Sequence, residues 1–290
     1  MAEKTGLVLE GGALKGIFTC GILDVFMEKN ISFDGIVGVS AGAVFGCNLK
    51  SHQAGRALRY NKRFARDRRY ASWWSFFKTG DFYGADFCYR ELPEVLDVWD
   101  AEAFKKDKTE FYAVTTDIIS GKPHYQKLEN GNAEDIQWLR ASATVPIVSR
   151  ICELNGGKYL DGGLRDEVPL KFFEGLGYKK NIVILTNPLS HKEKYSPLLY
   201  FIEKLFFKKY PELLKTMKSV SERNTKTFDY INEQEKLENI LVIRPPYELP
   251  IGAKAKDENQ LDQVYELGRI TALERLEEIK EFLKVKKEGK

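Results

Sequence analysis

Several residue patterns that carry common functions are missing from this chain of 290 residues. Its four cysteines form no C-x-x-C pair, and its three histidines, His52, His124 and His191, show no metal-site spacing. We therefore expect no metal ion and no organic cofactor. The 45 basic and 42 acidic residues nearly cancel, to a net charge of +3. A nucleic-acid-binding protein would show a strong basic excess, so no nucleic-acid partner is expected.

Long hydrophobic runs are also absent. No apolar stretch approaches the roughly 20 residues that a membrane-spanning helix needs. Residues 1–5 lead into a short apolar strand without the layout of a signal peptide. The cysteines, Cys20, Cys47, Cys88 and Cys152, are widely spaced, which is typical of buried or free thiols in a reducing compartment. These features predict a cytoplasmic protein.

What is present is an alternation of strands and helices. Residues 6–9 and 36–39 are short apolar runs, and each is followed by a helical pattern. This order predicts an α/β fold with a mostly parallel central sheet and helices on both faces. Further strands are expected at 111–115, 158–160, 182–185 and 240–243, and helices at 134–141, 170–175, much of 197–238 and from 261 towards the C-terminus. Because no linker interrupts this pattern, residues 1–290 are predicted to form a single domain.

The segment from 56 to 90 departs from the strand pattern, because basic residues alternate with aromatic ones. We predict a helical cap insertion at about 55–105. Its Arg and Lys side chains and Trp73-Trp74 suit contact with a membrane surface, but a packed cap with a solvated basic face explains the segment equally well. A second apolar stretch, at 198–207, suits either an acyl pocket or the core, and we favour the core. The region from 191 to 290 is otherwise expected to be helical.

The strongest chemical signal is Gly38-Val39-Ser40-Ala41-Gly42, a G-x-S-x-G motif between a predicted strand and a predicted helix. A nucleophile elbow requires this context, because its tight turn forces the serine into a strained backbone and leaves no room for side chains beside it. Ser40 is therefore predicted to be a catalytic serine. The alternative is a serine that only caps a helix.

A glycine-rich loop, Glu10-Gly11-Gly12-Ala13-Leu14-Lys15-Gly16, follows the first strand. A phosphate loop would have Ser or Thr after the final Gly-Lys, and a dinucleotide loop would have glycine in place of Ala13. An oxyanion hole fits better, because adjacent parallel strands would bring the exposed N–H groups of this loop beside Ser40.

The base that would activate Ser40 has two candidates. Asp161, at a predicted strand end and followed by Gly162-Gly163, is accessible to a partner hydroxyl, and partial burial would raise its pKa towards neutrality. His191 completes the order Ser40, Asp161, His191 of α/β-hydrolase triads, but it lies in a polar loop, and only one strand precedes the elbow strand. We favour Asp161.

Together, these motifs and the segment Ala141-Ser142-Ala143-Thr144-Val145-Pro146 resemble the patatin-like phospholipase family in its stand-alone bacterial form. The resemblance covers about residues 6–190. It implies a Ser40–Asp161 dyad without histidine and an oxyanion hole formed by the N–H groups of Gly11, Gly12 and Ala13. The residues that support these motifs would be Lys15, Gly16, Gly38, Gly42 and Gly162. Ala13 stands where the family often has glycine, and its methyl group is expected to require a negative φ.

The resemblance implies a serine hydrolase that cleaves fatty-acyl esters of phospholipids, lysophospholipids or related lipids through an acyl-Ser40 intermediate. Two alternatives stay open. A transacylase would transfer the same acyl group to an alcohol other than water. A lipid-binding or regulatory protein with a degenerate site would bind lipid without turnover.

Overall fold

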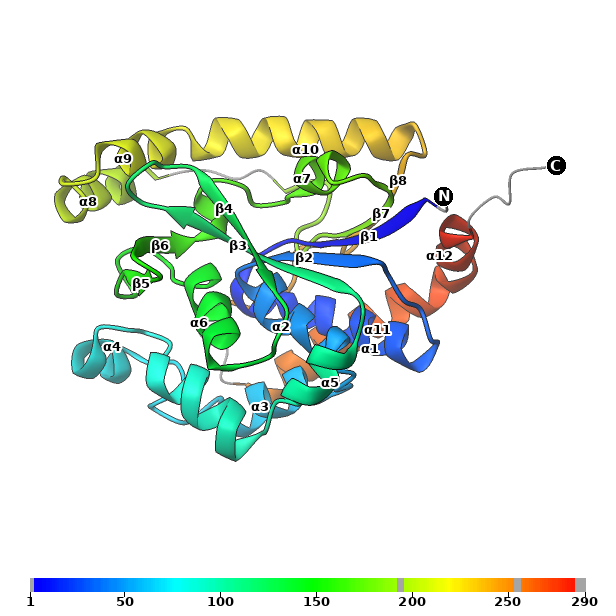
Figure 1. The fold of residues 1–290 in the computed structure, drawn as a ribbon, viewed down its shortest axis with the longest axis horizontal. Coiled ribbons are helices and arrows are strands. Elements are labelled where there is room, and N and C mark those ends of the chain that lie inside the picture. Colours follow the sequence, from blue (N-terminus) through cyan, green and yellow to red (C-terminus); the bar gives the residue numbers. More distant parts are fainter. Residues whose placement is uncertain (1–2, 192–195, 253–256, 285–290) are drawn as a thin grey trace.

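A single mixed sheet organises the chain. The computed structural model describes residues 3–191, 196–252 and 257–284. The parallel strands are β1 (Lys4–Leu9), β2 (Gly35–Val39), β3 (Glu110–Asp117), β7 (Tyr178–Ile184) and β8 (Ile240–Ile243); the antiparallel ones are β4 (Pro123–Leu128), β5 (Cys152–Leu154) and β6 (Gly157–Asp161). The order across the sheet is β5-β6-β3-β2-β1-β7-β8, and β4 pairs with β3 (Figure 1).

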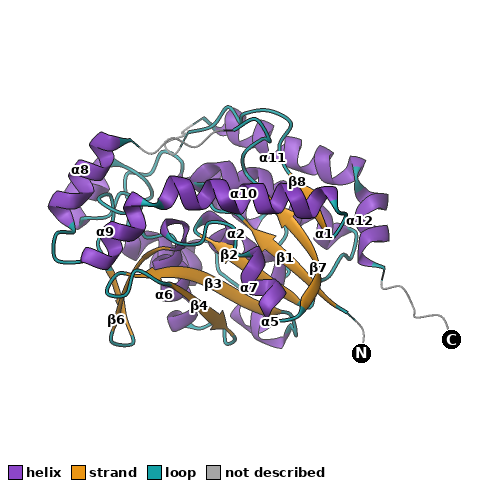
Figure 2. Ribbon diagram, turned by 90° about the horizontal axis from the view of Figure 1, so that it is seen from above, coloured by secondary structure: helices purple, strands orange, loops and turns teal. Residues whose placement is uncertain are grey.

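Helices cover both faces of this sheet (Figures 1 and 2). One face packs on α1 (Ile17–Glu28), α2 (Ala41–Lys50), α6 (Ala133–Ser142) and α11 (Glu258–Glu274), and the other on α7 (Leu170–Gly175) and α10 (Val220–Lys236). Alternate residues of β1 enter the two cores, Leu7 and Leu9 on one side and Val8 on the other. Two-sided burial explains why the central strands are continuous apolar runs.

The structure confirms the α/β class and the six strands expected from the sequence. It adds β4 and β5, which the sequence pattern did not predict. Strand β4 is polar and half-buried, and β5 has only three residues, so neither produces an apolar run. The helical stretch expected within 197–238 is divided into α8 (Pro197–Phe206), α9 (Pro211–Lys218) and α10, and α8 and α9 each begin at a proline, a residue favoured in the first helical turn.

The region predicted as a cap contains α3 (Arg56–Phe64), α4 (Trp73–Thr79), the π-helix η2 (Phe87–Leu96) and α5 (Ala101–Lys106). Part of its basic character is internal. Arg56 is only 4% exposed, and its guanidinium donates to the carbonyl oxygen of Asp97 at 2.6 Å and to Oδ1 of Asn48 at 2.9 Å. This arginine joins the segment to α2 instead of forming a solvated face.

The expectation that residues 198–207 belong to the core is wrong for most of them. Leu198, Phe201, Leu205 and Phe206 are all at least 58% exposed, whereas Phe207, after the helix ends, is buried. An apolar stripe at helical spacing looks the same in the sequence whether its partner is another part of the chain or something outside it. Only the position of α8 decides, and α8 lies at one end of the molecule (Figures 1 and 2).

The four cysteines are free thiols, and Cys20, Cys47 and Cys152 are buried. Among the described residues, no helix is both long enough and apolar enough to cross a bilayer.

Helix α11 ties the C-terminal part of the chain to its beginning by packing closely on α1. A Cβ atom at Gly268 would lie 2.0 Å from the carbonyl oxygen of Phe18, and one at Gly21 would lie 2.1 Å from that of Tyr265. The hydroxyl of Tyr265 also donates to Asp24 at 2.6 Å. The two helices therefore meet backbone to backbone, and only glycine fits at these points.

We expect Gly268→Ala to force α1 and α11 apart and to lower the free energy of unfolding by about 1–3 kcal/mol. Urea or thermal denaturation followed by circular dichroism measures this loss. Gly175→Ala is the matched control, since a Cβ atom there meets nothing within 4 Å. Equal stability of the two variants would contradict the close contact.

Candidate active site

Ser40 occupies the turn between β2 and α2, and its backbone is strained. Its φ is 52° and its ψ is −121°, a region that non-glycine residues rarely adopt. Its N–H donates to Oγ of Ser142 at 2.9 Å, and the Ser142 hydroxyl donates to the carbonyl oxygen of Val114 at 2.7 Å. The turn is thereby attached to β3, the neighbouring strand.

Glycines on both sides of Ser40 permit this turn. A Cβ atom at Gly42 would lie 2.5 Å from the carbonyl oxygen of Leu9, and one at Gly38 would lie 2.5 Å from the backbone nitrogen of Ala43. Strand β1 and the start of α2 therefore pack directly on the turn, as the G-x-S-x-G pattern predicts.

Asp161 ends β6 and is 8% exposed. It pairs with Thr115 of β3, and the N–H of Gly163 donates to its Oδ1 at 2.8 Å. Burial raises the pKa of Asp161 to about 6, although side-chain hydrogen bonding with Ser40 and the bond from Gly163 act in the opposite direction. The structure thus brings Ser40 together with a buried carboxyl group whose pKa lies above its ordinary value.

The glycine-rich loop lies against Ser40. A Cβ atom at Gly11 would be 3.2 Å from Cβ of Ser40. Within the described parts of the chain, no hydrogen bond uses the N–H of Gly11 or Gly12. Ala13 has a φ of 50°, so the expectation that its methyl group requires a negative φ is wrong. This backbone conformation is unfavourable for alanine.

A buried polar cluster packs against this glycine-rich loop. Glu10 is fully buried, and its carboxylate accepts hydrogen bonds from the backbone and the hydroxyl of Thr186 and from the amide of Asn187. Burial raises the pKa of Glu10. The Thr186 hydroxyl also lies 2.8 Å from the carbonyl oxygen of Gly11, and Lys15 donates to Oδ1 of Asn187 at 2.5 Å. These contacts fix the path of the loop.

The other residues predicted to support the motifs are also close to this region. A Cβ atom at Gly16 would lie 2.9 Å from the Phe45 ring, and one at Gly162 would lie 2.3 Å from the carbonyl oxygen of Val114. The structure thus gathers the predicted site residues at one edge of the sheet: Gly11, Gly12, Ala13, Lys15, Gly16, Gly38, Ser40, Gly42, Asp161 and Gly162.

The histidines take no part in this group. His191 Nδ1 is 2.7 Å from Oε1 of Glu248, and it is Asp161 that hydrogen bonds with Ser40. His52 pairs with Asp107 at 2.8 Å. His124 is half-buried and stacks on Trp138 with ring centroids 5.1 Å apart.

No motif in the sequence indicates a role for Ser142, Thr186 or Asn187. Ser142 lies in the Ala141–Pro146 segment that carries the family resemblance. The resemblance therefore pointed to this segment but not to what Ser142 does. Thr186 and Asn187 follow β7, which pairs with β1. Since residues at the ends of adjacent parallel strands meet, knowing the strand order would have identified both.

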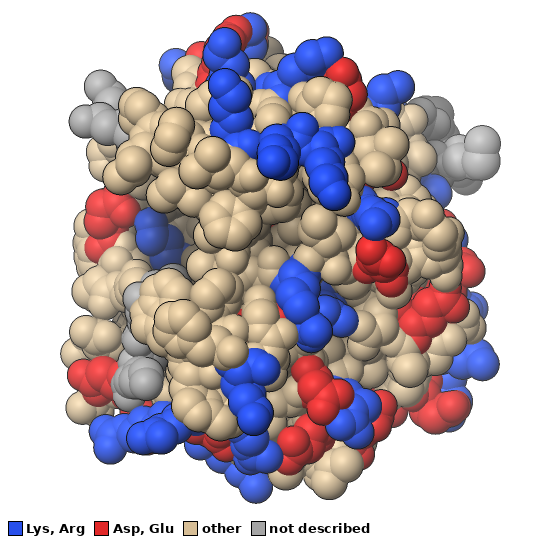
Figure 3. Space-filling view, turned by 90° about the vertical axis from the view of Figure 1, so that its left-hand side faces the viewer, with Lys and Arg blue, Asp and Glu red and all other residues tan. Residues whose placement is uncertain are grey.

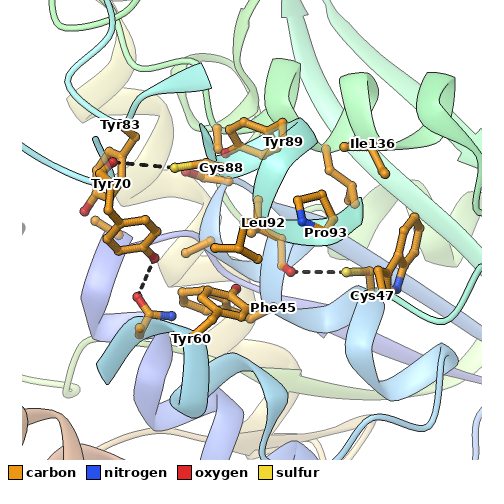
Figure 4. A pocket seen from close by; sticks show the side chains of 18 of the residues that line it. Phe45, Cys47, Tyr60, Tyr70, Tyr83, Cys88, Tyr89, Leu92, Pro93 and Ile136 are labelled. Carbon is orange, nitrogen blue, oxygen red and sulfur yellow. Dashed lines mark hydrogen bonds between the residues drawn. The ribbon is translucent and has the colours of Figure 1, made fainter. Parts of the chain in front are cut away.

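Ser40 is one of the residues that line a cavity reaching into the cap region. Figure 4 shows the part of its wall that contains Phe45, Tyr60 and Tyr89. Its walls are mainly aromatic and aliphatic, and Ala13, Ser40, Ala143 and Val145 lie among the residues that line it. Tyr60 comes from α3, Tyr89, Leu92 and Pro93 from η2, and Phe45 from α2. The Tyr70 hydroxyl donates to Oδ1 of Asn61 at 2.7 Å within this wall. The cavity therefore offers an apolar chain a place next to the serine.

Known proteins resemble this chain in sequence. A protein YjjU of Escherichia coli K12, described as uncharacterized, is 33% identical over 195 residues, which are 64% of this chain and 52% of that protein. The lysophospholipase nte1 of Aspergillus terreus is 30% identical over 189 residues, which are 60% of this chain and 11% of that protein. The chain thus spans about half of the first relative and a small part of the second.

Among solved structures, VipD of Legionella pneumophila aligns over 95% of this chain and 67% of its own, with a TM-score of 0.47 and 12% identity. Two family models match different parts of the sequence. Residues 210–284 match a domain of unknown function. Residues 7–173, more than half of the chain, match the patatin-like phospholipase model, and they include Ser40, Asp161 and the glycine-rich loop. The chain belongs to the patatin-like phospholipase family.

Proposed function

We propose that this protein is a lipid acyl hydrolase that cleaves fatty-acyl ester bonds through Ser40 and Asp161. The observation that carries the proposal is the hydrogen bonding of Ser40 with a buried carboxyl group of pKa about 6, at one end of an apolar cavity. The match to the patatin-like phospholipase model and the similarity to a lysophospholipase support lipid hydrolysis as the class of reaction. Phospholipids, lysophospholipids and related acyl esters are the proposed substrates.

The proposed chemistry has two halves. Asp161 takes the proton of the Ser40 hydroxyl as Oγ attacks the ester carbon, and the tetrahedral intermediate collapses to acyl-Ser40. The leaving alcohol receives that proton from Asp161. Asp161 then takes a proton from a water molecule that attacks the acyl group, and the proton returns to Ser40 as the free fatty acid leaves. A base of pKa about 6 is largely ionised at neutral pH, as both halves require.

The glycine-rich loop would stabilise the negative charge that develops on the ester oxygen. The N–H groups of Gly11, Gly12 and Ala13 are the proposed donors, and the start of α2 adds a helix N-terminus on the same side. One well-placed donor is worth about 3–4 kcal/mol in the transition state. The cluster of Glu10, Thr186, Asn187 and Lys15 would keep these donors in position.

The segment from 56 to 90 is proposed to contact a lipid surface. Trp73 and Trp74 on α4 are both 48% exposed, and tryptophan favours the boundary between water and lipid. Other aromatic residues of the segment, such as Tyr60 and Tyr89, line the cavity instead. We therefore propose that the segment both closes the acyl pocket and meets the lipid.

The first test measures p-nitrophenyl butyrate hydrolysis and labelling by a fluorophosphonate probe. Ser40→Ala should abolish labelling and lower kcat by roughly 10³-fold or more, because the nucleophile is lost. Asp161→Asn should lower kcat by roughly 10²–10⁴-fold, because the general base is lost. Ser190→Ala and Asp229→Asn, both at exposed positions, are the matched controls. Full activity of Asp161→Asn with loss of activity in His191→Ala would show that the base is wrong.

The raised pKa of Asp161 predicts the pH dependence of the reaction. Asp161 accepts a proton only when it is ionised, so kcat/KM for p-nitrophenyl butyrate should rise with pH, with a midpoint near the pKa of about 6. A profile that is flat between about pH 5 and 8 would exclude Asp161 as the base.

The same shift has a stability consequence that serves as an independent check. The folded pKa lies above the unfolded value of about 3.9, so the ionised carboxylate destabilises the fold. This penalty is absent below about pH 4 and complete above about pH 6. The free energy of unfolding of Asp161→Asn should therefore exceed that of wild type at pH 8 by up to about 3 kcal/mol, and urea denaturation should show no such gain at pH 4.

Replacing Ala13 by glycine should stabilise the fold. An alanine at φ 50° costs about 1 kcal/mol or more relative to glycine, so Ala13→Gly should raise the unfolding temperature while butyrate hydrolysis continues. Ala133→Gly, in the first turn of α6, is the control and should lower stability. Loss of stability in both variants would contradict the strained conformation of Ala13.

A further inference from the structure

Helix α8 carries an apolar face that the described residues leave open. Leu198, Phe201 and Leu205 recur at steps of three and four residues and are 68%, 58% and 60% exposed. Phe206 is 65% exposed. The helix is attached through Phe207, which packs with Leu160 and Leu213 in a small buried cluster. Leu160 lies in β6, the strand that ends at Asp161, so α8 is anchored to the strand that carries the candidate base.

Helix α4 presents a similar face at the same end of the molecule (Figure 1). Trp73, Trp74 and Phe77 are exposed, Phe77 by 82%. These two helices are more than a hundred residues apart in the sequence, and α4 lies on the opposite side of this end from α8 (Figure 1).

The chain between α6 and β5 connects the two helices. On the α4 side, the N–H of Phe82 donates to the carbonyl oxygen of Val148 at 2.8 Å. On the α8 side, Ile147 and Ile151 pack against the cluster that holds Phe207. Val145, from the same stretch, lines the cavity of Ser40 and is 41% exposed. The stretch between α6 and β5 therefore links the surroundings of both helices to the wall of the cavity. We call the following set the apolar rim: Trp73, Trp74, Phe77, Val145, Leu198, Phe201, Leu205 and Phe206.

Cations accompany the apolar rim. Lys204, Lys208, Lys209 and Lys218 are exposed, and none of them forms an ion pair within the described parts of the chain. The same holds near α4 for Arg66, Arg68 and Lys78. Figure 3 views this end and shows Lys and Arg side chains across its upper part, where α8 and α9 lie. The rim thus combines apolar side chains with an excess of positive charge.

We propose that the apolar rim docks on an anionic lipid bilayer, with α8 and α4 lying in the interface on either side of the cavity mouth. Apolar side chains backed by lysines are what an interfacial helix uses, and each lysine near the surface adds attraction to anionic headgroups. A second copy of the chain is a poorer occupant, because a symmetric pair would bring two basic faces together. The inference rests on the proposed function, since docking would let an acyl chain pass from the bilayer to Ser40 without crossing water.

The test is cosedimentation of the full chain with vesicles of phosphatidylcholine, with and without phosphatidylglycerol, in a Ser40→Ala background that leaves the lipid intact. Phe201→Ser/Leu205→Ser should weaken binding to the anionic vesicles roughly tenfold or more, because two inserted side chains lose their apolar contact. Trp73→Ala/Trp74→Ala should weaken it comparably. Leu237→Ser is the matched control, 59% exposed at the end of α10, and should bind like the parent protein.

The contribution of positive charge to vesicle binding is tested with Lys208→Gln/Lys209→Gln. This variant should bind anionic vesicles roughly tenfold less tightly and should differ little from the parent on phosphatidylcholine alone. Sedimentation without lipid checks the competing occupant. If the parent is a dimer that Phe201→Ser/Leu205→Ser converts to monomers, the face is a self-association surface and the lipid proposal is overturned.

Hydrolysis of p-nitrophenyl butyrate by the same variants, with Ser40 restored, separates this inference from the proposed function. Unchanged butyrate turnover with weakened vesicle binding is the expected result. Vesicle binding that no rim substitution affects would overturn docking while leaving the hydrolase proposal standing. A wild-type protein that binds vesicles through the rim but never hydrolyses butyrate would overturn the hydrolase proposal alone.

Discussion

The positive φ of Ser40 is the constraint on which the rest of the site depends. A non-glycine residue at φ 52° and ψ −121° costs about 1–3 kcal/mol and persists only where its surroundings enforce it. Here β2 is held between β1 and β3, the backbone of Leu9 touches Gly42, and Ser142 accepts the N–H of Ser40. The sheet thus supplies the energy that keeps the hydroxyl beside Asp161 and the glycine-rich loop.

The buried carboxyl group places stability and chemistry in opposition. Asp161 is 8% exposed, and its pKa of about 6 means that the ionised form, which the proposed mechanism needs, is the form that burial disfavours. Ala13 shows the same conflict on a smaller scale, because it holds an unfavourable φ in the loop that faces Ser40. Backbone strain at Ser40 and Ala13 and burial of the Asp161 carboxyl group thus occur together where the chemistry is proposed, and the two cores on either side of the sheet compensate for their cost.

Aromatic residues of the cap region serve two different environments. Tyr60 and Tyr89 form part of the wall of the cavity, whereas Trp73 and Phe77 are exposed on the surface of the same region. Helix α8 adds a second exposed apolar face from a distant part of the chain, and it is anchored to β6, the strand that ends at Asp161. The pocket for a single acyl chain would then be continuous with a surface that contacts the lipid bilayer. This arrangement suits an enzyme whose substrate is insoluble in water.

The sequence by itself determined the α/β class, the elbow at Ser40 and the identity of Asp161 as a candidate partner, because these depend on local patterns: apolar runs, glycine spacing and a strand-end aspartate. Tertiary structure alone decided the rest. Ser142, Thr186 and Asn187 support the site only because β3 and β7 are neighbours of β2 and β1. The apolar stripe of α8 was assigned to the core, yet it faces outward. The spacing of the apolar residues determines which of them share one face of the helix. The packing of the whole chain determines whether that face contacts the core or solvent.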